Sequence, residues 1–240
     1  MKFIEKLKEK NEKMSTYRQP TIVCFGDSVT QGCFEVFRRG KEIDTVFEPM
    51  EGYVEKLRKL LSTLFPMASP VVINAGRSGG RAETEAKRLE RDVLSFQPDL
   101  VIVCFGLNDA TRGKEEIARY VNALTEIFEK VQASGAELIF MTPNLRCTEI
   151  DYTITDEKVV ETAERIAKSE KDGDLAFYLD AARAICKEKN IPVCDCNRIW
   201  EKFRDGGVDI QLLLSNKINH PTREMHMLFA YELLKTIFAS

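Results

Sequence analysis

The sequence predicts one α/β domain, a three-layer α/β/α sandwich around a parallel five-stranded sheet. Short apolar runs alternate with longer segments in which apolar residues recur every three or four positions, a pattern typical of strands joined by crossover helices. With 240 residues and 44% hydrophobic content, the chain can bury one large core. No linker composition divides it, so we expect an N-terminal helical extension over residues 1–18 and a single domain over residues 19–240.

The expected strands are short and strongly apolar. The clearest is the run from Asp99 to Phe105, which is apolar almost throughout, as in a strand covered on both faces. The last contains Pro192, which favours an edge position. The five predicted strands lie at residues 21–25, 71–73, 99–105, 138–141 and 191–194.

The expected helices have amphipathic spacing. They lie at residues 2–14, 53–65, 81–96, 117–131, 155–170, 174–189 and 222–238. Residues 33–50 show no sustained period, so we expect an irregular loop there, placed where it can cover a substrate. Residues 144–154 form a second loop near the same rim.

Composition and charge exclude several classes of protein. The 35 basic and 38 acidic residues give a net charge of -3, and no basic stripe with interleaved aromatics indicates nucleic-acid binding. No apolar run approaches a membrane span, and the N-terminus lacks the features of a signal peptide, so we expect a cytoplasmic protein.

The seven cysteines include no C-x-x-C pair and are expected to be reduced. Cys194-Asp195-Cys196 is a weak zinc signal, and we expect neither metal nor cofactor. The oligomeric state is not predicted.

The first polar turn follows the strand over residues 21–25. The strand stops at Gly26 and is followed by Asp27 and Ser28. In open parallel sheets ligands bind beyond the carboxyl ends of the strands, so Ser28 is a candidate nucleophile. The alternative is that Asp27 and Ser28 are only turn and helix-cap residues.

The second polar turn offers another candidate serine. Gly76, Ser78 and Gly80 match the G-x-S-x-G nucleophile elbow of α/β-hydrolases, which also lies between a strand and a helix. In that interpretation Ser78 attacks the substrate. In the other, this glycine-rich turn offers a backbone N–H to an oxyanion, or serves only as a turn.

The third polar turn and the histidines supply the remaining candidates. Asn108 follows the strand over residues 99–105 and carries an amide that can stabilise an oxyanion, while Asp109 can brace the loop by accepting backbone N–H bonds. A serine nucleophile needs a base, normally histidine, and the chain has two. His220 lies just before the predicted C-terminal helix, whereas His226 lies within it and is expected to pack or face solvent.

Together these turns resemble the sequence blocks of the SGNH (GDSL-type) hydrolases. Gly26-Asp27-Ser28 resembles the first block, Asn74 to Gly79 the second, Gly106-x-Asn108-Asp109 the third, and His220-Pro221 the last. All four stand in the family's order. The resemblance implies a flavodoxin-like domain over residues 19–240.

The resemblance also implies roles for individual residues. Ser28 is the nucleophile and His220 the general base. The oxyanion hole consists of the Ser28 N–H, the Gly79 N–H and the Asn108 side chain. Asp27 and Asp109 support these groups, and Ser78 becomes a turn residue.

One position departs from the family pattern. Lys217 stands three residues before His220, where the family usually has the aspartate that orients the histidine. A backbone carbonyl near Lys217, or a carboxylate such as Asp209 or Asp195, is the expected replacement.

The resulting hypothesis is a serine esterase that hydrolyses a small acyl or acetyl ester, carbohydrate esters included, through an acyl-enzyme. Its partner is then a small-molecule ester. The alternatives are an α/β-hydrolase that uses Ser78, a lysophospholipase or thioesterase, and a non-catalytic ligand-binding relative. Residues 33–50 and 144–154 are expected to decide the substrate.

Overall fold

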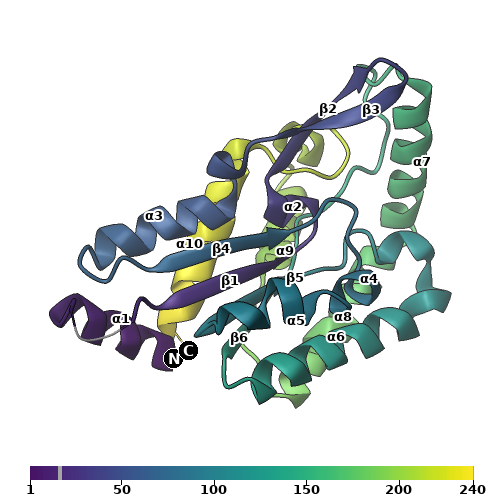
Figure 1. Ribbon diagram of the computed structural model, residues 1–240. Coiled ribbons are helices and arrows are strands. Elements are labelled where there is room, and N and C mark those ends of the chain that lie inside the picture. The colour runs from purple at the N-terminus through teal and green to yellow at the C-terminus, as the bar shows by residue number, and fades with distance from the viewer. Residues whose placement is uncertain (16–17, 240) are drawn as a thin grey trace.

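A parallel five-stranded sheet forms the centre of the molecule, with its strands in the order β4-β1-β5-β6-β7 (Figure 1). The computed structural model describes residues 1–15 and 18–239. The strands are β1 (Thr21–Gly26), β4 (Val71–Gly76), β5 (Leu100–Cys104), β6 (Glu137–Met141) and β7 (Val193–Cys194). Counted along the sheet's own strands the order is 2-1-3-4-5, the flavodoxin-like doubly wound topology. The predicted fold is confirmed, and β7 is an edge strand as Pro192 indicated.

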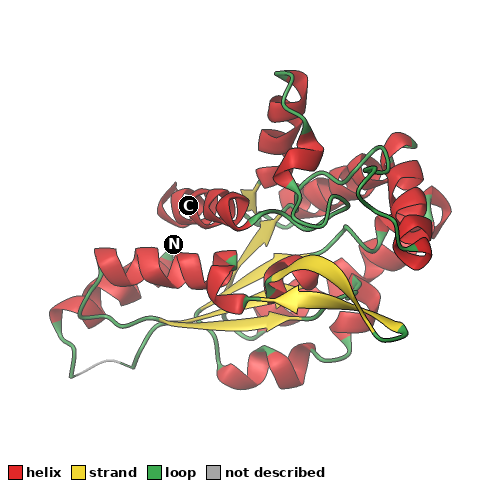
Figure 2. Ribbon diagram, turned by 90° about the horizontal axis from the view of Figure 1, so that it is seen from above, coloured by secondary structure: helices red, strands yellow, loops and turns green. Residues whose placement is uncertain are grey.

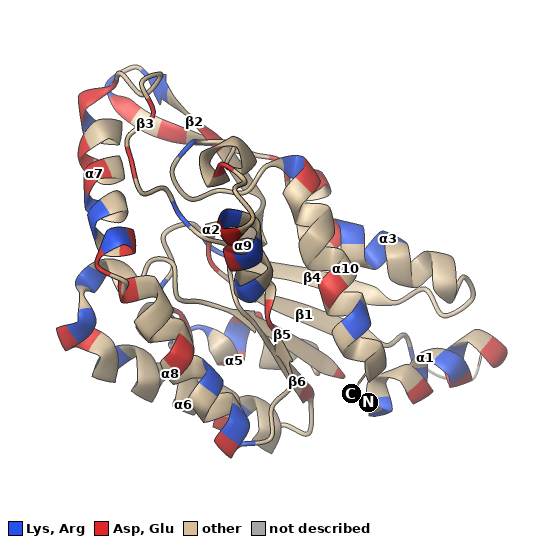
Figure 3. Ribbon diagram, turned by 180° about the vertical axis from the view of Figure 1, so that it is seen from behind, with Lys and Arg blue, Asp and Glu red and all other residues tan. Residues whose placement is uncertain are grey.

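Helices cover both faces of the sheet (Figure 2). One layer contains α3, α9 and α10, and the other contains α4, α5, α6 and α8 (Figures 1 and 3). The helices of these layers are α3 (Tyr53–Leu64), α9 (Cys196–Asp205), α10 (Arg223–Ala239), α4 (Ala82–Ala86), α5 (Leu89–Asp92), α6 (Ile117–Ala133) and α8 (Asp174–Glu188). The remaining helices are α1 (Lys2–Glu12), α2 (Ser28–Gln31) and α7 (Glu157–Lys171), and short 3₁₀ turns occupy Pro49–Glu51, Leu94–Phe96, Ala110–Arg112, Lys114–Glu116 and Ile210–Leu213.

The core lies on the two central strands. Every residue of β1 and β5 is buried, because helices cover both faces of these strands. Phe25 at the end of β1 meets Phe105, just beyond β5, edge to face with ring centroids 5.1 Å apart. These rigid strands fix the positions of the polar turns that follow them.

The N-terminal helix belongs to this core. In α1, Phe3 and Leu7 are fully buried, and the backbone N–H groups of Lys2 and Phe3 donate to the Glu137 carboxylate at the start of β6. We expected the N-terminal extension to end at residue 18. Residues 16–17, which directly precede that boundary, lie outside the described part of the chain. No helix among the described residues is both long enough and apolar enough to cross a membrane.

Two sequence predictions of local structure are wrong. The helix expected over residues 81–96 is broken into α4, α5 and a 3₁₀ turn, and the break lies at Arg88, whose buried guanidinium donates to the Ala75 carbonyl. Residues 33–50 contain an antiparallel hairpin, β2 (Cys33–Arg39) and β3 (Glu42–Phe47), rather than an irregular loop. The register shifts between Cys33 and Val36, and this irregularity disrupts the two-residue alternation that identifies strands.

The hairpin extends from the carboxyl end of the sheet to α7 (Figure 1). Near its tip, Arg38 Nε donates to the carboxylate of Asp156, the N-cap of α7, at 2.7 Å. The hairpin and α7 therefore both stand at the sheet edge where the polar turns emerge.

Candidate active site

Ser28 begins α2 directly beyond the end of β1. Asp27 caps this short helix, because its Oδ1 accepts a hydrogen bond from Val29 N at 3.0 Å. Close packing of α2 on β4 requires glycine at position 76, where a Cβ would lie 2.2 Å from Gln31 N. The Ser28 side chain lines a cavity of about 360 Å³ and is otherwise buried. The strand, the cap and this packing together fix the serine.

Gly79 lies beside Ser28 in the turn after β4 and lines the same cavity. Its φ of +74° is a left-handed conformation that favours glycine. Neither Ser28 N nor Gly79 N donates a hydrogen bond to any atom of the described chain. Both N–H groups are thus free to bind an anionic oxygen at the cavity.

Ser78 also lines the cavity but does not have the geometry of a nucleophile elbow. It lies in the turn itself, and helix α4 begins only at Ala82, whereas an elbow serine stands directly between its strand and its helix. Its backbone N–H donates to Gln31 Oε1 at 2.6 Å. Ser28 has the strand-to-helix position that the elbow motif suggested for Ser78.

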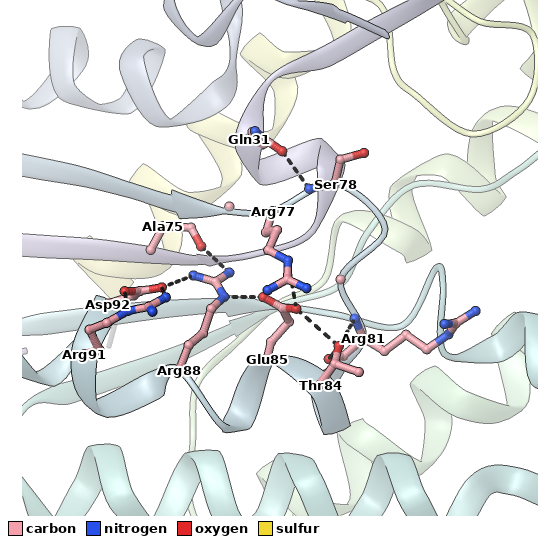
Figure 4. Close-up of polar contacts among 12 residues, drawn as sticks. Gln31, Ala75, Arg77, Ser78, Arg81, Thr84, Glu85, Arg88, Arg91 and Asp92 are labelled. Carbon is pink, nitrogen blue, oxygen red and sulfur yellow. Dashed lines mark hydrogen bonds and ion pairs between the residues drawn. The ribbon is translucent and has the colours of Figure 1, made fainter. Parts of the chain in front are cut away.

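A buried ion-pair cluster supports this turn from below (Figure 4). Glu85 is fully buried and pairs with Arg88, while Arg77 approaches it from the turn at 3.6 Å. Arg88 also donates to the Ala75 carbonyl at 2.8 Å. With the Gln31 contact from α2 above, the turn is held on both sides (Figure 4).

The Asn108 side chain completes this side of the cavity. Its Nδ2 donates to the Gly80 carbonyl at 3.0 Å and lies 3.5 Å from Asp27 Oδ2. The first bond occupies one N–H, and the second distance is too long for a strong bond, so one N–H can turn to a ligand oxygen. Arg81 Nε donates to the Asn108 carbonyl at 3.0 Å and helps to hold the residue.

Two buried carboxyl groups, those of Asp27 and Asp109, support the turns that carry Ser28, Gly79 and Asn108. Asp109 Oδ1 accepts from Ala82 N at 2.9 Å, which braces the glycine turn, whereas its Oδ2 has no hydrogen-bond partner among the described residues. Burial raises the pKa of both Asp27 and Asp109 to about 7, although backbone N–H bonds act in the opposite direction. Burial therefore favours the protonated form of both groups up to about neutral pH.

His220 reaches the cavity from the loop before α10. Asn216 organises this loop, because its Oδ1 accepts backbone N–H bonds from residues 218, 219 and 220 at 2.9–3.0 Å. Sequence analysis did not identify Asn216. The available signal was an asparagine in a short polar loop, where its side chain commonly bonds the backbone two residues on.

The Phe34 carbonyl of β2 orients the imidazole. His220 Nδ1 lies 2.8 Å from Phe34 O, and a carbonyl oxygen can only accept, so Nδ1 carries the proton in this contact. In the neutral ring Nε2 is then the unprotonated nitrogen. Burial lowers the pKa of His220 below its usual value, while the Phe34 contact opposes this shift. A neutral imidazole that can accept a proton at Nε2 is thus favoured.

The carboxylates proposed to replace the missing aspartate lie elsewhere. Asp195 binds Arg183 and Thr142, and Asp209 caps the 3₁₀ turn at Ile210 by accepting from Gln211 N. Lys217 has a φ of +60° and donates from Nζ to the Gln211 carbonyl. The partner of His220 Nδ1 is a backbone carbonyl, but it comes from the hairpin and not from the neighbourhood of Lys217.

Arg223, the first residue of α10, holds the base of the hairpin. It forms two bonds with Glu35 at 2.7 and 3.0 Å and one with Glu48 at 2.7 Å, and its guanidinium lies 4.4 Å from the centroid of the Phe34 ring. The residue whose carbonyl meets His220 is therefore tied to the helix that follows His220.

The second histidine is a packing residue. His226 is fully buried, its Nδ1 accepts from Tyr53 N at 3.0 Å, and its ring packs against Phe34. Burial lowers its pKa to about 3, so the ring is neutral at physiological pH. Of the two roles expected for His226, packing or facing solvent, the structure shows packing.

The hairpin and α7 form the outer walls of the cavity. The hairpin contributes Val36, Glu42 and Ile43, as expected for residues 33–50. The loop over residues 144–154, in contrast, contributes no side chain to the lining. Asn144 donates to the Asn219 carbonyl and the Cys147 N–H to the Ile218 carbonyl, so this loop supports the His220 loop. Instead α7 supplies lining residues that sequence analysis did not single out: Lys158, Val159, Thr162, Arg165 and Ile166.

The weak zinc signal has no further support. Cys194 and Cys196 place their sulfur atoms 3.7 Å apart in the core, but Asp195 is engaged by Arg183. Over residues 1–15 and 18–239, no group of three or more His, Cys, Asp or Glu side chains is arranged to hold a metal ion.

Comparison with solved structures identifies proteins of the same fold. The acetyl xylan esterase AlAXEase is 20% identical, with 90% of this chain and 99% of that chain covered and a TM-score of 0.67. A catalytic mutant of Axe2, an acetylxylan esterase from Geobacillus stearothermophilus, is 22% identical over 91% and 94%, with a TM-score of 0.66. The lipase/acylhydrolase from Enterococcus faecalis is 22% identical over 91% and 95%, with a TM-score of 0.64.

Sequence comparison identifies the family. No curated protein sequence gives a significant match. The family model described as GDSL-like Lipase/Acylhydrolase matches residues 24–228, which include all four sequence blocks and both histidines. The chain therefore belongs to the GDSL-like lipase/acylhydrolase family and is a carboxylic ester hydrolase.

Proposed function

We propose that this protein is a serine esterase that hydrolyses small acyl or acetyl esters in the cytoplasm, with Ser28 as nucleophile and His220 as general base. Carbohydrate acetates are one substrate class in this proposal, since AlAXEase and Axe2 are described as acetyl xylan esterases. The observation that carries the proposal is that Ser28, Gly79, Asn108 and His220 line one cavity. The tautomer that the Phe34 contact favours leaves Nε2 of His220 as the base.

The reaction follows from these positions. His220 Nε2 takes the proton of the Ser28 hydroxyl as Oγ attacks the ester carbonyl carbon. The N–H groups of Ser28 and Gly79 and the Asn108 amide bind the oxyanion that forms. The proton on Nε2 then passes to the departing alcohol. His220 then takes a proton from a water molecule as the water attacks the acyl carbon, and it returns that proton to Ser28 Oγ as the acid leaves.

Labelling with a small fluorophosphonate, read by intact mass, tests the nucleophile. We expect one adduct on the unmutated chain and on Ser78→Ala, and none on Ser28→Ala. Ser78→Ala is a matched control because Ser78 lines the same cavity from a neighbouring turn. An adduct that survives in Ser28→Ala but not in Ser78→Ala would move the nucleophile to Ser78.

A further inference from the structure

We infer that the cavity selects esters that carry an anionic group, through Arg81, Lys158 and Arg165. This inference names the substrate class of the proposed esterase and rests on that function. Three cationic side chains and one carboxylate, Glu42, line the cavity. The lining thus has an excess of two positive charges, although the whole chain has a net charge of -3.

These cations have no carboxylate partner within the described chain. No ion pair joins Arg81, Lys158 or Arg165 to an acidic side chain, whereas cations just outside the cavity are paired. Arg38 pairs with Asp156 and Arg112 with Glu83, at 2.7 Å in both cases. An anionic ligand would supply these three cations with the negatively charged partner that Arg38 and Arg112 already have.

Two of the cations lie on one face of α7. Lys158, Thr162 and Arg165 follow each other at spacings of four and three residues, so their side chains share a helix face. Thr162 Oγ1 donates back to the Lys158 carbonyl, and Lys158 Nζ makes only a long contact, 3.4 Å, with the Lys41 carbonyl. The ends of both cationic side chains therefore remain available to a ligand.

Arg81 stands on the other side, beside the oxyanion donors. Its Nε is occupied by the Asn108 carbonyl, which leaves the terminal nitrogens of the guanidinium without a hydrogen-bond partner in the described chain. Its side chain points away from the buried Glu85 cluster (Figure 4). Arginine binds carboxylate and phosphate groups through two parallel N–H bonds.

The remaining lining residues indicate the chemistry of the uncharged part of the ligand. Val36, Ile43, Val159, Ile166 and Ile218 provide apolar surface, and among the described residues of the lining His220 contributes the only ring. A neutral sugar would have no aromatic face to stack on. The lining fits a small ester with an apolar skeleton and a carboxylate, phosphate or sulfate group.

Matched substrate pairs test the inference. In the first pair, 3-acetoxybenzoate carries the negative charge on the alcohol side of the ester, and 3-acetoxybenzamide is its neutral counterpart. In the second pair, 4-nitrophenyl hydrogen glutarate carries the charge on the acyl side, and 4-nitrophenyl valerate is its neutral counterpart. We expect a higher kcat/KM for the anionic member of at least one pair. Arg165→Gln and Lys158→Gln should each reduce that preference about two- to five-fold, as expected for exposed charge pairs. Added salt should reduce it as well.

Lys171→Gln is the control, because it removes a positive charge from the same helix outside the cavity. It should leave the preference unchanged. Equal rates within both pairs, or a preference that the double variant Lys158→Gln/Arg165→Gln leaves undiminished, would overturn the inference.

A binding measurement separates this inference from the esterase proposal. In the Ser28→Ala background, calorimetry should detect tighter binding of isophthalate than of isophthalamide, and the double variant, which keeps Arg81, should reduce the difference. That result would support the anion site even if no ester were hydrolysed, in which case the proposed function alone would fail. Equal binding of the two compounds, together with turnover of neutral esters, would overturn the anion site alone.

Discussion

The serine side of the site is held by buried groups, whereas the histidine side is held by a hairpin and half-exposed ion pairs. Asp27 and Asp109 are almost inaccessible and accept backbone N–H bonds at 2.9–3.0 Å. Around His220, the orienting atom is the Phe34 carbonyl, and the Arg223 side chain that fixes its strand is about one-third exposed. The two sides therefore differ in burial and in the kind of group that positions the reacting atoms.

This difference separates a serine side fixed by buried groups from a histidine side held by the hairpin, although residues of both sides line the cavity. The oxyanion donors that we propose belong to turns held by the central sheet and by the buried Asp27 and Asp109 side chains. The hairpin both orients His220 and lines the cavity through Val36 and Ile43. A change in the hairpin is thus expected to affect substrate binding and the base together.

The largest expected effect comes from removing the base. His220→Ala should lower kcat by about 10²–10⁴-fold, because general base catalysis typically contributes that much. Steady-state kinetics on a neutral acetyl ester measures the change. Lys217→Ala is the control and should stay within about three-fold, since its Nζ bonds only the Gln211 carbonyl. If His220→Ala kept most of the activity, the assignment of the base would be lost.

The second-largest effect is expected for Asp109→Asn, a variant that tests the role of the buried carboxyl groups. Because the folded pKa of Asp109, about 7, lies above the ordinary aspartate value of 3.8, the folded state holds this proton more tightly than the unfolded state. The wild-type protein therefore loses stability as pH rises from about 4 to 7, and asparagine avoids that loss. We expect Asp109→Asn to be the more stable variant at pH 8 by an amount on the order of 2 kcal/mol.

Denaturant unfolding at pH 5 and pH 8 provides this measurement. Glu90→Gln is a suitable control, since Glu90 is an exposed acidic residue of helix α5 that forms no ion pair with another described residue. A stability difference between Asp109→Asn and wild type that stays constant with pH would show that Asp109 is not a buried acid with a raised pKa.

The smallest effect concerns the ion pairs on the histidine side. Arg223→Gln should lower kcat about three- to ten-fold, because β2 loses its tie to α10 while the His220 loop stays intact. It should also move the acid limb of the kcat/KM profile to higher pH, since the Glu35 carboxylate, which raises the pKa of His220, would lose its partner Arg223.

The matched control for Arg223 lies on the same hairpin. Arg38→Gln breaks the ion pair between the hairpin tip and Asp156 but leaves Phe34 and Arg223 unchanged. It should not shift the acid limb. If both variants, or neither, shifted the pH profile, the special role of Arg223 in positioning His220 would be refuted.

The sequence by itself determined the layers of the fold and the candidate residues of the site. Apolar runs such as residues 99–105 predicted the central strands, because a strand covered on both faces must be apolar throughout. Polar turns at the ends of those strands predicted that Ser28, Gly79 and Asn108 would share one edge of the sheet. These signals are local, so they can be read without knowledge of the packing.

Only the tertiary structure decided how His220 is oriented and what surrounds the ester. Every residue has a backbone carbonyl, so nothing in the sequence distinguishes Phe34 O from any other, and the register shift in β2 obscured the hairpin that presents it. Arg165 is on a helix more than 130 residues away from Ser28 in the sequence, yet both line one cavity. Such groups meet only through long-range packing, which leaves no local pattern in the chain.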